Sequence, residues 1–320
     1  YFEIEFQEYM QFKFRQQWMK LKAYANEKGI QIIGDIPIYV AMDSADTWAN
    51  PWLFKLDEKN CPTQVAGCPP DGFSATGQLW GNPLYNWEVH RNSGYEWWIK
   101  RIANCFRLYD VVRIDHFRGF DEYYAIPYGD ATAENGWWEK GPGIDLFRAI
   151  SASLGDREII AEDLGYMTDS VKRLVEESGY PNMKVIEFAF DERDTGNASD
   201  YLPHNYPRNC VVYTGTHDNE TLLSWLEDIT PAERRQVRKY LNNFKDSGKE
   251  LCDDLICLVM QSVANLCIVP MQDYLGLDNS ARMNQPSTLG KNWKWRLKEG
   301  QFTAELQKEM LELATRYGRR

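Results

Sequence analysis

Short apolar runs alternate with helical stretches along most of this sequence, and this alternation constrains the fold more than any other feature. The apolar runs are residues 31–40, 111–115, 158–163, 183–188, 211–214 and 266–270. Helical periodicity is found in residues 5–28, 95–108, 144–153 and 169–178, and in two stretches across 231–266. Short apolar strands that alternate with helices are typical of βαβ units around a parallel sheet whose strands are buried on both faces.

The apolar runs end in polar or charged residues, and the corresponding edge of an α/β barrel carries the active site. We therefore predict an α/β fold of the (β/α)8 TIM-barrel type with inserted loop subdomains. Six strands are two short of a closed barrel and the sequence does not begin with Met, so we expect N-terminal strands to lie outside this chain. Residues 1–320 would then form a partial catalytic barrel domain, with 41–100 as an inserted subdomain or loop array over the active-site cleft.

Composition and charge narrow the possible functions. With 14% aromatic residues the chain can bury a core, and no apolar run approaches the ~20 residues of a membrane helix. The net charge of −11 disfavours nucleic-acid binding. Seven scattered cysteines without a C-x-x-C pair, and no signal peptide, favour the cytoplasm, with a plastid as the alternative. No H-E-x-x-H, P-loop or G-x-G-x-x-G motif is present, so we expect neither a metal nor an organic cofactor.

Three acidic residues, Asp115, Glu162 and Asp218, stand at the ends of predicted strands. Because side chains alternate between the two faces of a strand, Arg113 and Asp115 point the same way. Glycosidic cleavage needs one carboxylate at the anomeric carbon and one protonated carboxyl group that releases the leaving oxygen. Asp115 fits the first role because a neighbouring Arg lowers a carboxyl pKa, and Glu162 fits the second because an apolar strand raises it. Asp218 and His217 fit hydrogen bonding to sugar hydroxyl groups.

Each of these acids could instead have a purely structural role. A single acidic residue at a strand end is more often a helix N-cap or half of a surface ion pair, and Asp163 and Asp218 could both be caps. Aldolases and phosphate-binding barrels also place charges at this edge. Three acids at strand ends, two of them with Arg or His nearby, nevertheless favour a catalytic site.

Longer motifs surround the three acids. They are R-I-D-H-F-R-G-F at 113–120, I-I-A-E-D-L-G at 159–165 and G-T-H-D-N-E-T at 215–221. Others are G-D-I-P-I-Y-V at 34–40, D-S-A-D-T-W-A-N-P at 43–51, G-C-P-P-D-G-F-S-A-T-G-Q-L-W-G-N-P-L-Y-N-W at 67–87 and R-M-N-Q-P-S-T-L-G-K-N-W-K-W-R at 282–296. Together and in this order, the motifs resemble those of the 4-α-glucanotransferases, also called amylomaltases or disproportionating enzymes, which form glycoside hydrolase family 77 of the α-amylase clan.

The resemblance implies a retaining transfer of part of an α-1,4-glucan to the 4-OH of an acceptor. Its partners would be α-1,4-glucans, maltooligosaccharides and glucose, and it would need no cofactor. Asp115 would be the nucleophile, Glu162 the acid/base and Asp218 the third carboxylate, which stabilises the transition state. The implied substrate-binding residues are Arg113, His217, Asp35, Asp71, Phe73, Gln78, Trp80 and Asn284. The chain departs from the family pattern at Gly72, where a bulky residue is usual, and at Ser287, where Gly is usual.

Trp80 is also the aromatic residue that the sequence itself favours for stacking on a sugar ring, because glycines flank it on an expected loop. Three other functions stay open. The chain could be an α-glucan hydrolase, since the balance between transfer and hydrolysis cannot be seen in the motifs. It could be a barrel that binds glucans without catalysis, although such a protein would not need all three acids. It could also be an unrelated barrel enzyme such as a phosphate-sugar lyase, although a Gly-rich phosphate loop is missing.

Overall fold

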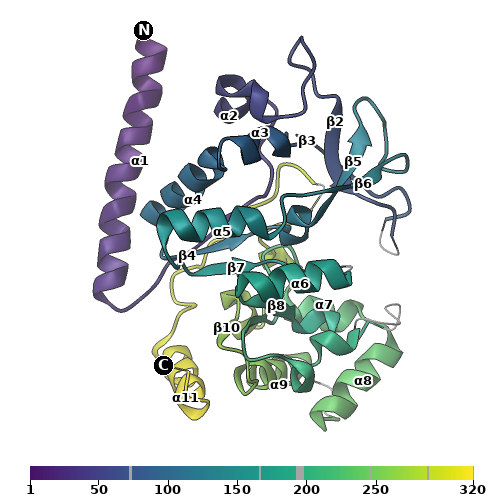
Figure 1. The fold of residues 1–320 in the computed structure, drawn as a ribbon. Coiled ribbons are helices and arrows are strands. Elements are labelled where there is room, and N and C mark those ends of the chain that lie inside the picture. The colour runs from purple at the N-terminus through teal and green to yellow at the C-terminus, as the bar shows by residue number, and fades with distance from the viewer. Residues whose placement is uncertain (72–73, 166, 192–197, 245–246, 287, 320) are drawn as a thin grey trace. The chain divides into compact units, whose positions relative to one another are not determined.

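The structure is a computed structural model of the 320-residue chain, and it describes all residues except 72–73, 166, 192–197, 245–246, 287 and 320 (Figure 1). The chain divides into two compact units, Tyr1–Asn182 and Met183–Arg320. No helix among the described residues is both long enough and apolar enough to cross a membrane.

The first unit contains three neighbouring parallel strands, in the order β1, β4, β7. They are β1 (Ile33–Ile36), β4 (Val111–Ile114) and β7 (Ile159–Ala161). All residues of β4 and β7 are buried, as expected for strands covered on both faces. Gly34 of β1 lies against the Tyr109 ring, so closely that a Cβ there would be 2.1 Å from a ring carbon. A glycine at this position therefore lets β1 pair with β4.

Helices follow or precede these strands in the places that the periodicity predicts (Figure 1). They are α1 (Phe2–Glu27), α4 (Glu96–Leu108), α5 (Ile144–Leu154) and α6 (Asp169–Ser178). The helix α6 begins at the N-cap Thr168 and ends at Gly179, which adopts a left-handed conformation. No residue of α1 is buried; its Trp18 indole donates a hydrogen bond to the carbonyl of Leu108 at 2.8 Å and so ties α1 to the end of α4.

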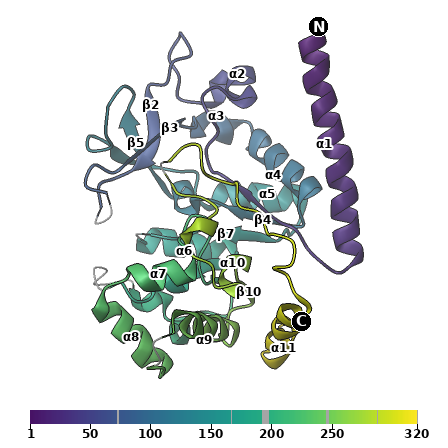
Figure 2. The ribbon, with the colours of Figure 1, turned by 180° about the vertical axis from the view of Figure 1, so that it is seen from behind.

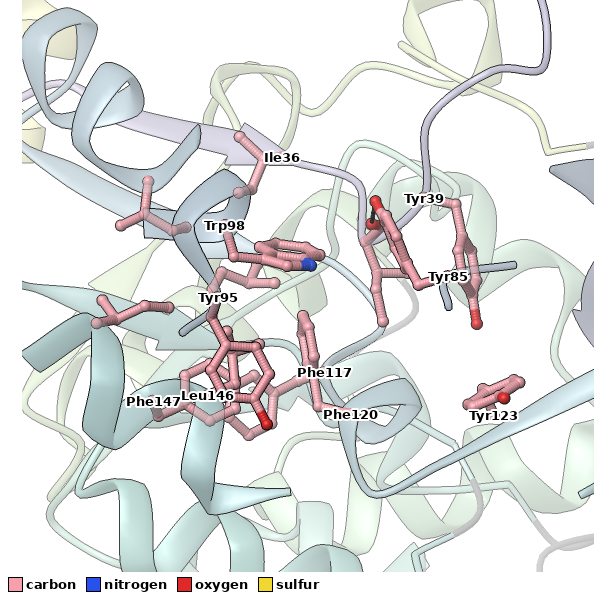
Figure 3. Close-up of a cluster of buried hydrophobic side chains, with 14 of the residues drawn as sticks. Ile36, Tyr39, Tyr85, Tyr95, Trp98, Phe117, Phe120, Tyr123, Leu146 and Phe147 are labelled. Atoms are coloured by element: carbon pink, nitrogen blue, oxygen red, sulfur yellow. Dashed lines mark hydrogen bonds between the residues drawn. The ribbon is translucent and has the colours of Figure 1, made fainter. Parts of the chain in front are cut away.

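Aromatic side chains form much of the core of the first unit (Figure 3). Trp98 of α4 and Phe120 pack edge to face with ring centroids 5.2 Å apart, and Phe117 stacks on Phe147 of α5 at 4.8 Å. These contacts join α4 and α5 to the short helix η2 (Phe117–Phe120), which directly follows the end of β4. The core thus anchors the chain just beyond Asp115 through packed aromatic rings.

A second, antiparallel sheet of the first unit has the strand order β3-β2-β5-β6. Its strands are β2 (Gln64–Cys68), β3 (Gln78–Pro83), β5 (Glu122–Pro127) and β6 (Trp137–Lys140). Nearby are α2 (Ala45–Ala49), η1 (Pro51–Leu53) and α3 (Trp87–Asn92). The expected insertion 41–100 supplies β2 and β3, whereas their partners β5 and β6 come from residues after 120.

Apart from Asn182, the first residue of β8, the second unit contains strands in the order β8, β9, β10, of which β9 and β10 run parallel. The strands are β8 (Asn182–Val185), β9 (Cys210–Tyr213) and β10 (Leu266–Ile268). The α-helices, several of them visible in Figure 2, are α7 (Leu222–Asp228), α8 (Pro231–Leu241), α9 (Gly248–Met260), α10 (Met271–Tyr274) and α11 (Ala304–Arg316). Short helices are η3 (Ile186–Phe188), η4 (Ala198–Tyr201), η5 (Pro203–Asn205) and η6 (Asn279–Ala281). The predicted α/β alternation is confirmed in both units.

Candidate active site

Asp115 follows β4 and shares one arginine with Asp35. Arg113 Nη1 lies 3.1 Å from Asp115 Oδ1 and 2.6 Å from Asp35 Oδ2. The parallel pairing of β1 with β4 sets Asp35 opposite Arg113. The Arg113 side chain is 8% exposed, whereas those of Asp115 and Asp35 are 43% and 38% exposed. A buried positive charge therefore lies between two carboxylates that solvent can reach.

Glu162 directly follows β7, the strand beside β4, and it is buried. Two backbone amides donate hydrogen bonds to its carboxylate: His116 N to Oε2 at 2.6 Å and Leu164 N to Oε1 at 2.8 Å. Burial, and after it the negative charge of Asp115, raise the pKa of Glu162 to about 7, while Arg113 and the two amides oppose the shift. The carboxyl group can therefore gain and lose a proton near neutral pH, as a general acid/base must.

His116 links Glu162 to Trp80. The φ angle of His116 is 54°, in the left-handed region that is uncommon for residues other than glycine, and its amide nitrogen contacts Glu162. Its ring packs edge-on against Trp80, with centroids 4.8 Å apart. Burial, together with the charge of Arg118, lowers the pKa of the His116 ring to about 3. The ring is therefore neutral near pH 7, and the backbone amide, not a charged imidazole, contacts the acid.

The loop residues that the resemblance places at the substrate lie around β3 in the same unit. Trp80 is 36% exposed, and its indole nitrogen donates to Gln78 Oε1 at 3.1 Å. Asp71 Oδ1 accepts a hydrogen bond from the amide of Ser74 at 2.7 Å, which shapes the loop between β2 and β3. Gly72, Phe73 and Ser287 lie outside the described residues.

The second unit brings three further predicted residues together. Asp218 Oδ1 accepts a hydrogen bond from Asn284 Nδ2 at 2.5 Å, and Asp218 Oδ2 lies 3.4 Å from His217 Nε2. The amide of Asn284 also donates to the carbonyl of His217 at 3.0 Å. The His217 ring lies 5.1 Å from the ring of Trp293, a half-exposed residue whose φ of 60° is left-handed. The loop after β9 and the segment 282–293 therefore form one hydrogen-bonded cluster.

Neither Asp163 nor Asp218 is a helix cap, so the alternative that both residues are caps is wrong. The N-cap of α6 is Thr168 and that of α7 is Thr221. The acid that does reach the first amide of α7 is Asp273, whose Oδ1 accepts from Leu222 N at 2.9 Å. The Asp218 side chain instead contacts Asn284 and His217.

A cavity of about 130 Å³ adjoins the same loop in the second unit; His217, Glu220, Asp273 and Arg282 are among its lining residues. Sequence reasoning missed Arg282 here, as it missed His116 in the first unit. Both residues stand inside motifs of the family, and their contacts are made partly by backbone groups, which no residue pattern displays. In the described part of the chain, no group of three or more His, Cys, Asp and Glu residues is placed to hold a metal ion.

Comparisons with known proteins agree with the motifs. The family profile described as 4-alpha-glucanotransferase, of glycoside hydrolase family 77, matches residues 1–303. A 4-alpha-glucanotransferase of Streptococcus pneumoniae is 52% identical over 310 residues, which are 97% of this chain and 60% of that protein. One from Clostridium butyricum is 49% identical over 319 residues, covering 99% of this chain and 64% of that protein. The chain thus spans about three fifths of the length of these relatives.

A solved structure, the amylomaltase from Streptococcus agalactiae in complex with acarbose, matches with a TM-score of 0.93 and 43% sequence identity. The match covers 98% of this chain and 62% of that protein. It confirms the predicted α/β barrel architecture. A profile match over nearly the whole chain, relatives near 50% identity and this structural match all agree. The chain therefore belongs to glycoside hydrolase family 77, the family of the 4-alpha-glucanotransferases.

Proposed function

We propose that this chain carries the catalytic residues of a 4-alpha-glucanotransferase, which moves part of an α-1,4-glucan to the 4-OH of an acceptor glucan or glucose. The pair Asp115 and Glu162 is the main support. Asp115 is an accessible carboxylate beside a buried Arg, and Glu162 is a buried acid with a pKa raised to about 7. Two carboxyl groups with such different surroundings suit the ionised carboxylate and the protonated acid that glycosidic cleavage needs, and family membership supplies the retaining outcome and the substrate class.

The mechanism is a double displacement. Asp115 attacks the anomeric carbon while Glu162 gives its proton to the departing glycosidic oxygen, so that a covalent glucosyl-enzyme forms and the shortened glucan leaves. Glu162, now ionised, takes the proton of the acceptor 4-OH, whose oxygen attacks the same carbon and releases Asp115. Two inversions give net retention, and no step passes through a metal or cofactor. We expect the two carboxyl groups to be about 5–5.5 Å apart, the separation of retaining enzymes.

The remaining assignments rest on the resemblance to the family, and contacts within each unit support some of them. Arg113 neutralises part of the charge on Asp115 and Asp35, so we propose that it keeps the nucleophile ionised and that Asp35 binds sugar hydroxyl groups. We assign Asp218 as the third carboxylate. The other proposed substrate-binding residues are His217, Asn284, Asp71, Phe73, Gln78 and Trp80.

We also propose that residues 41–100 cover the cleft. Trp80 on β3 contacts the His116 ring, and the His116 amide contacts Glu162, so this segment reaches the acid/base within the first unit. A partly exposed indole that is linked to the acid/base through His116 can stack on the apolar C–H face of a sugar ring. Closure of such a segment over the bound sugar would keep water away from the glucosyl-enzyme and so favour transfer.

Incubation with maltotriose tests transfer against hydrolysis. Transfer produces longer oligomers together with glucose, whereas an α-glucan hydrolase yields only shorter sugars. A barrel that binds glucans without catalysis would leave maltotriose unchanged while still binding it. Product analysis by chromatography distinguishes the three outcomes, and the appearance of shorter sugars alone would replace the proposed transferase with a hydrolase.

We propose the cytoplasm as the location. All seven cysteines are free, including Cys61, which is exposed. Exposed free thiols persist most readily in a reducing compartment.

A further inference from the structure

One arginine, Arg282, binds the loop that follows β9 and carries Asp218; it comes from a segment later in the chain. Arg282 Nη2 donates a hydrogen bond to the backbone carbonyl of Asp218 at 2.6 Å, and Arg282 Nε donates to the carbonyl of Asn284 at 2.9 Å. Its Nη1 lies 3.7 Å from Glu220 Oε1, which also accepts from Asn279 Nδ2 at 2.8 Å. A single guanidinium therefore joins the loop that carries Asp218 to the segment that carries Asn284.

The two carbonyls that this guanidinium binds belong to the two residues whose side chains bind each other. Asn284 Nδ2 donates to Asp218 Oδ1, so the carboxylate direction depends on the relative position of both backbones. We propose that Arg282 is a positioning residue: it holds Asp218 and Asn284 in the orientation that glucan transfer needs. This inference rests on the proposed function, in which Asp218 is the third carboxylate.

The geometry calls for an arginine and not merely for a positive charge. A guanidinium presents its donors in a rigid planar fork, so it can reach two carbonyls and a carboxylate in fixed directions. A lysine ammonium is a single point on a flexible stem and would bind one of these oxygens at a time. The Arg282 side chain is 21% exposed, which leaves room for a small guanidinium ion to enter if the side chain is removed. Arg282→Lys therefore keeps the positive charge at this position but removes the planar fork of donors, so it tests the fork apart from the charge.

Arg319 provides a matched control in the same unit. It donates to three backbone carbonyls, those of Met260 at 2.7 Å, Ala264 at 2.9 Å and Ser262 at 2.9 Å. These carbonyls lie before the start of β10, whereas the Asp218 loop lies after the end of β9. Because β9 and β10 are parallel, Arg319 and Arg282 bind backbone at opposite ends of this strand pair. Arg319→Lys removes a fork of the same kind away from the candidate site.

The experiment measures kcat and KM for maltotriose disproportionation, together with the midpoint of thermal unfolding, in R282K, R282A and R319K. We expect R282K to lose roughly 100-fold in kcat with little change in KM, because displacement of a catalytic group by about 1 Å costs on that order. R319K should unfold at a lower temperature while keeping the wild-type kcat. Millimolar guanidinium should restore part of the kcat of R282A, and equal concentrations of NaCl or urea should not.

Wild-type kcat in R282K and R282A, or an equal loss of kcat in R319K, would overturn the inference, as would the failure of guanidinium to restore R282A. If circular dichroism shows that either variant does not fold, Arg282→Gln takes its place and is judged by the same outcomes. The absence of any transfer by the wild-type protein would instead overturn the proposed function, and it would be seen before the variants are compared.

Discussion

The raised pKa of Glu162 predicts a specific effect on stability. In the unfolded chain a glutamic acid has its ordinary pKa of 4.5, whereas in the folded protein burial beside Asp115 raises it to about 7. Between these two values the folded state keeps a proton that the unfolded state has lost. The folded protein is therefore destabilised progressively as the pH rises through this window, and the loss is complete above the folded pKa.

The size of the effect follows from the shift. Each pKa unit corresponds to about 1.4 kcal/mol, so the wild-type protein should lose about 3 kcal/mol of unfolding free energy between pH 4.5 and 8 on account of this group. Glu162→Gln removes the ionisation. The variant also loses a hydrogen-bond acceptor for one of the two amides, but that cost does not depend on pH. The difference in unfolding free energy between variant and wild type should therefore shift by about 3 kcal/mol in favour of the variant over this range.

Urea unfolding at a series of pH values, followed by tryptophan fluorescence, measures this difference. Glu158→Gln is the control, because it removes a carboxylate at the exposed N-terminal side of the same strand and should follow the wild-type pH dependence. A difference between E162Q and wild type that stays constant from pH 4.5 to 8 would show that Glu162 is not held in its neutral form. The proposed acid/base role would then lose its physical basis.

Further predictions concern catalysis and packing. Asp115→Asn should abolish turnover and leave the circular dichroism spectrum unchanged; wild-type rates in this variant would refute its role as nucleophile. The kcat/KM of the wild-type protein should fall above about pH 7, as Glu162 loses the proton that it donates, and a profile flat to pH 9 would contradict this. Gly34→Ala should lower the thermal unfolding midpoint, because its Cβ would overlap the Tyr109 ring and overpacking of this kind costs about 1–3 kcal/mol.

The parallel strands and most of the helices could be predicted from the sequence because each is specified locally. The run Val111 to Asp115 is apolar apart from Arg113 until its polar end, and α6 lies between a Thr cap and a Gly stop. Short-range patterns of this kind also placed Asp115 and Glu162 just beyond their strands. The side-by-side order of β4 and β7 agrees with the tendency of successive strands of one parallel sheet to be neighbours, although β5 and β6 of the other sheet lie between them in the chain.

The second sheet could not be predicted in the same way. Its strand β5 pairs with β2 across more than fifty residues, and β6 carries exposed tryptophans in place of an alternating pattern. Distance alone is not the obstacle, because β1 pairs with β4 across a longer stretch, from Ile33 to Val111. A strand without an alternating pattern gives no local signal, and its partner depends on which edges the tertiary structure brings together. The left-handed turn at His116 could not be predicted either, because histidine adopts positive φ more often than most residues but still in only a small fraction of cases.

Burial alone would not make Glu162 a useful general acid/base. The two backbone amides that donate to its carboxylate supply the opposing effect. In the proposed mechanism Glu162 must first give up a proton and then accept one, so its pKa has to stay close to the working pH. Burial and the charge of Asp115 raise the pKa of Glu162, and a larger rise would weaken the group as a base by leaving less of it ionised. The amides of His116 and Leu164, with Arg113, stabilise the ionised form and limit the rise. The strained turn at His116 therefore has a chemical purpose: it supplies one of the donors that let the same carboxyl group serve both half-reactions.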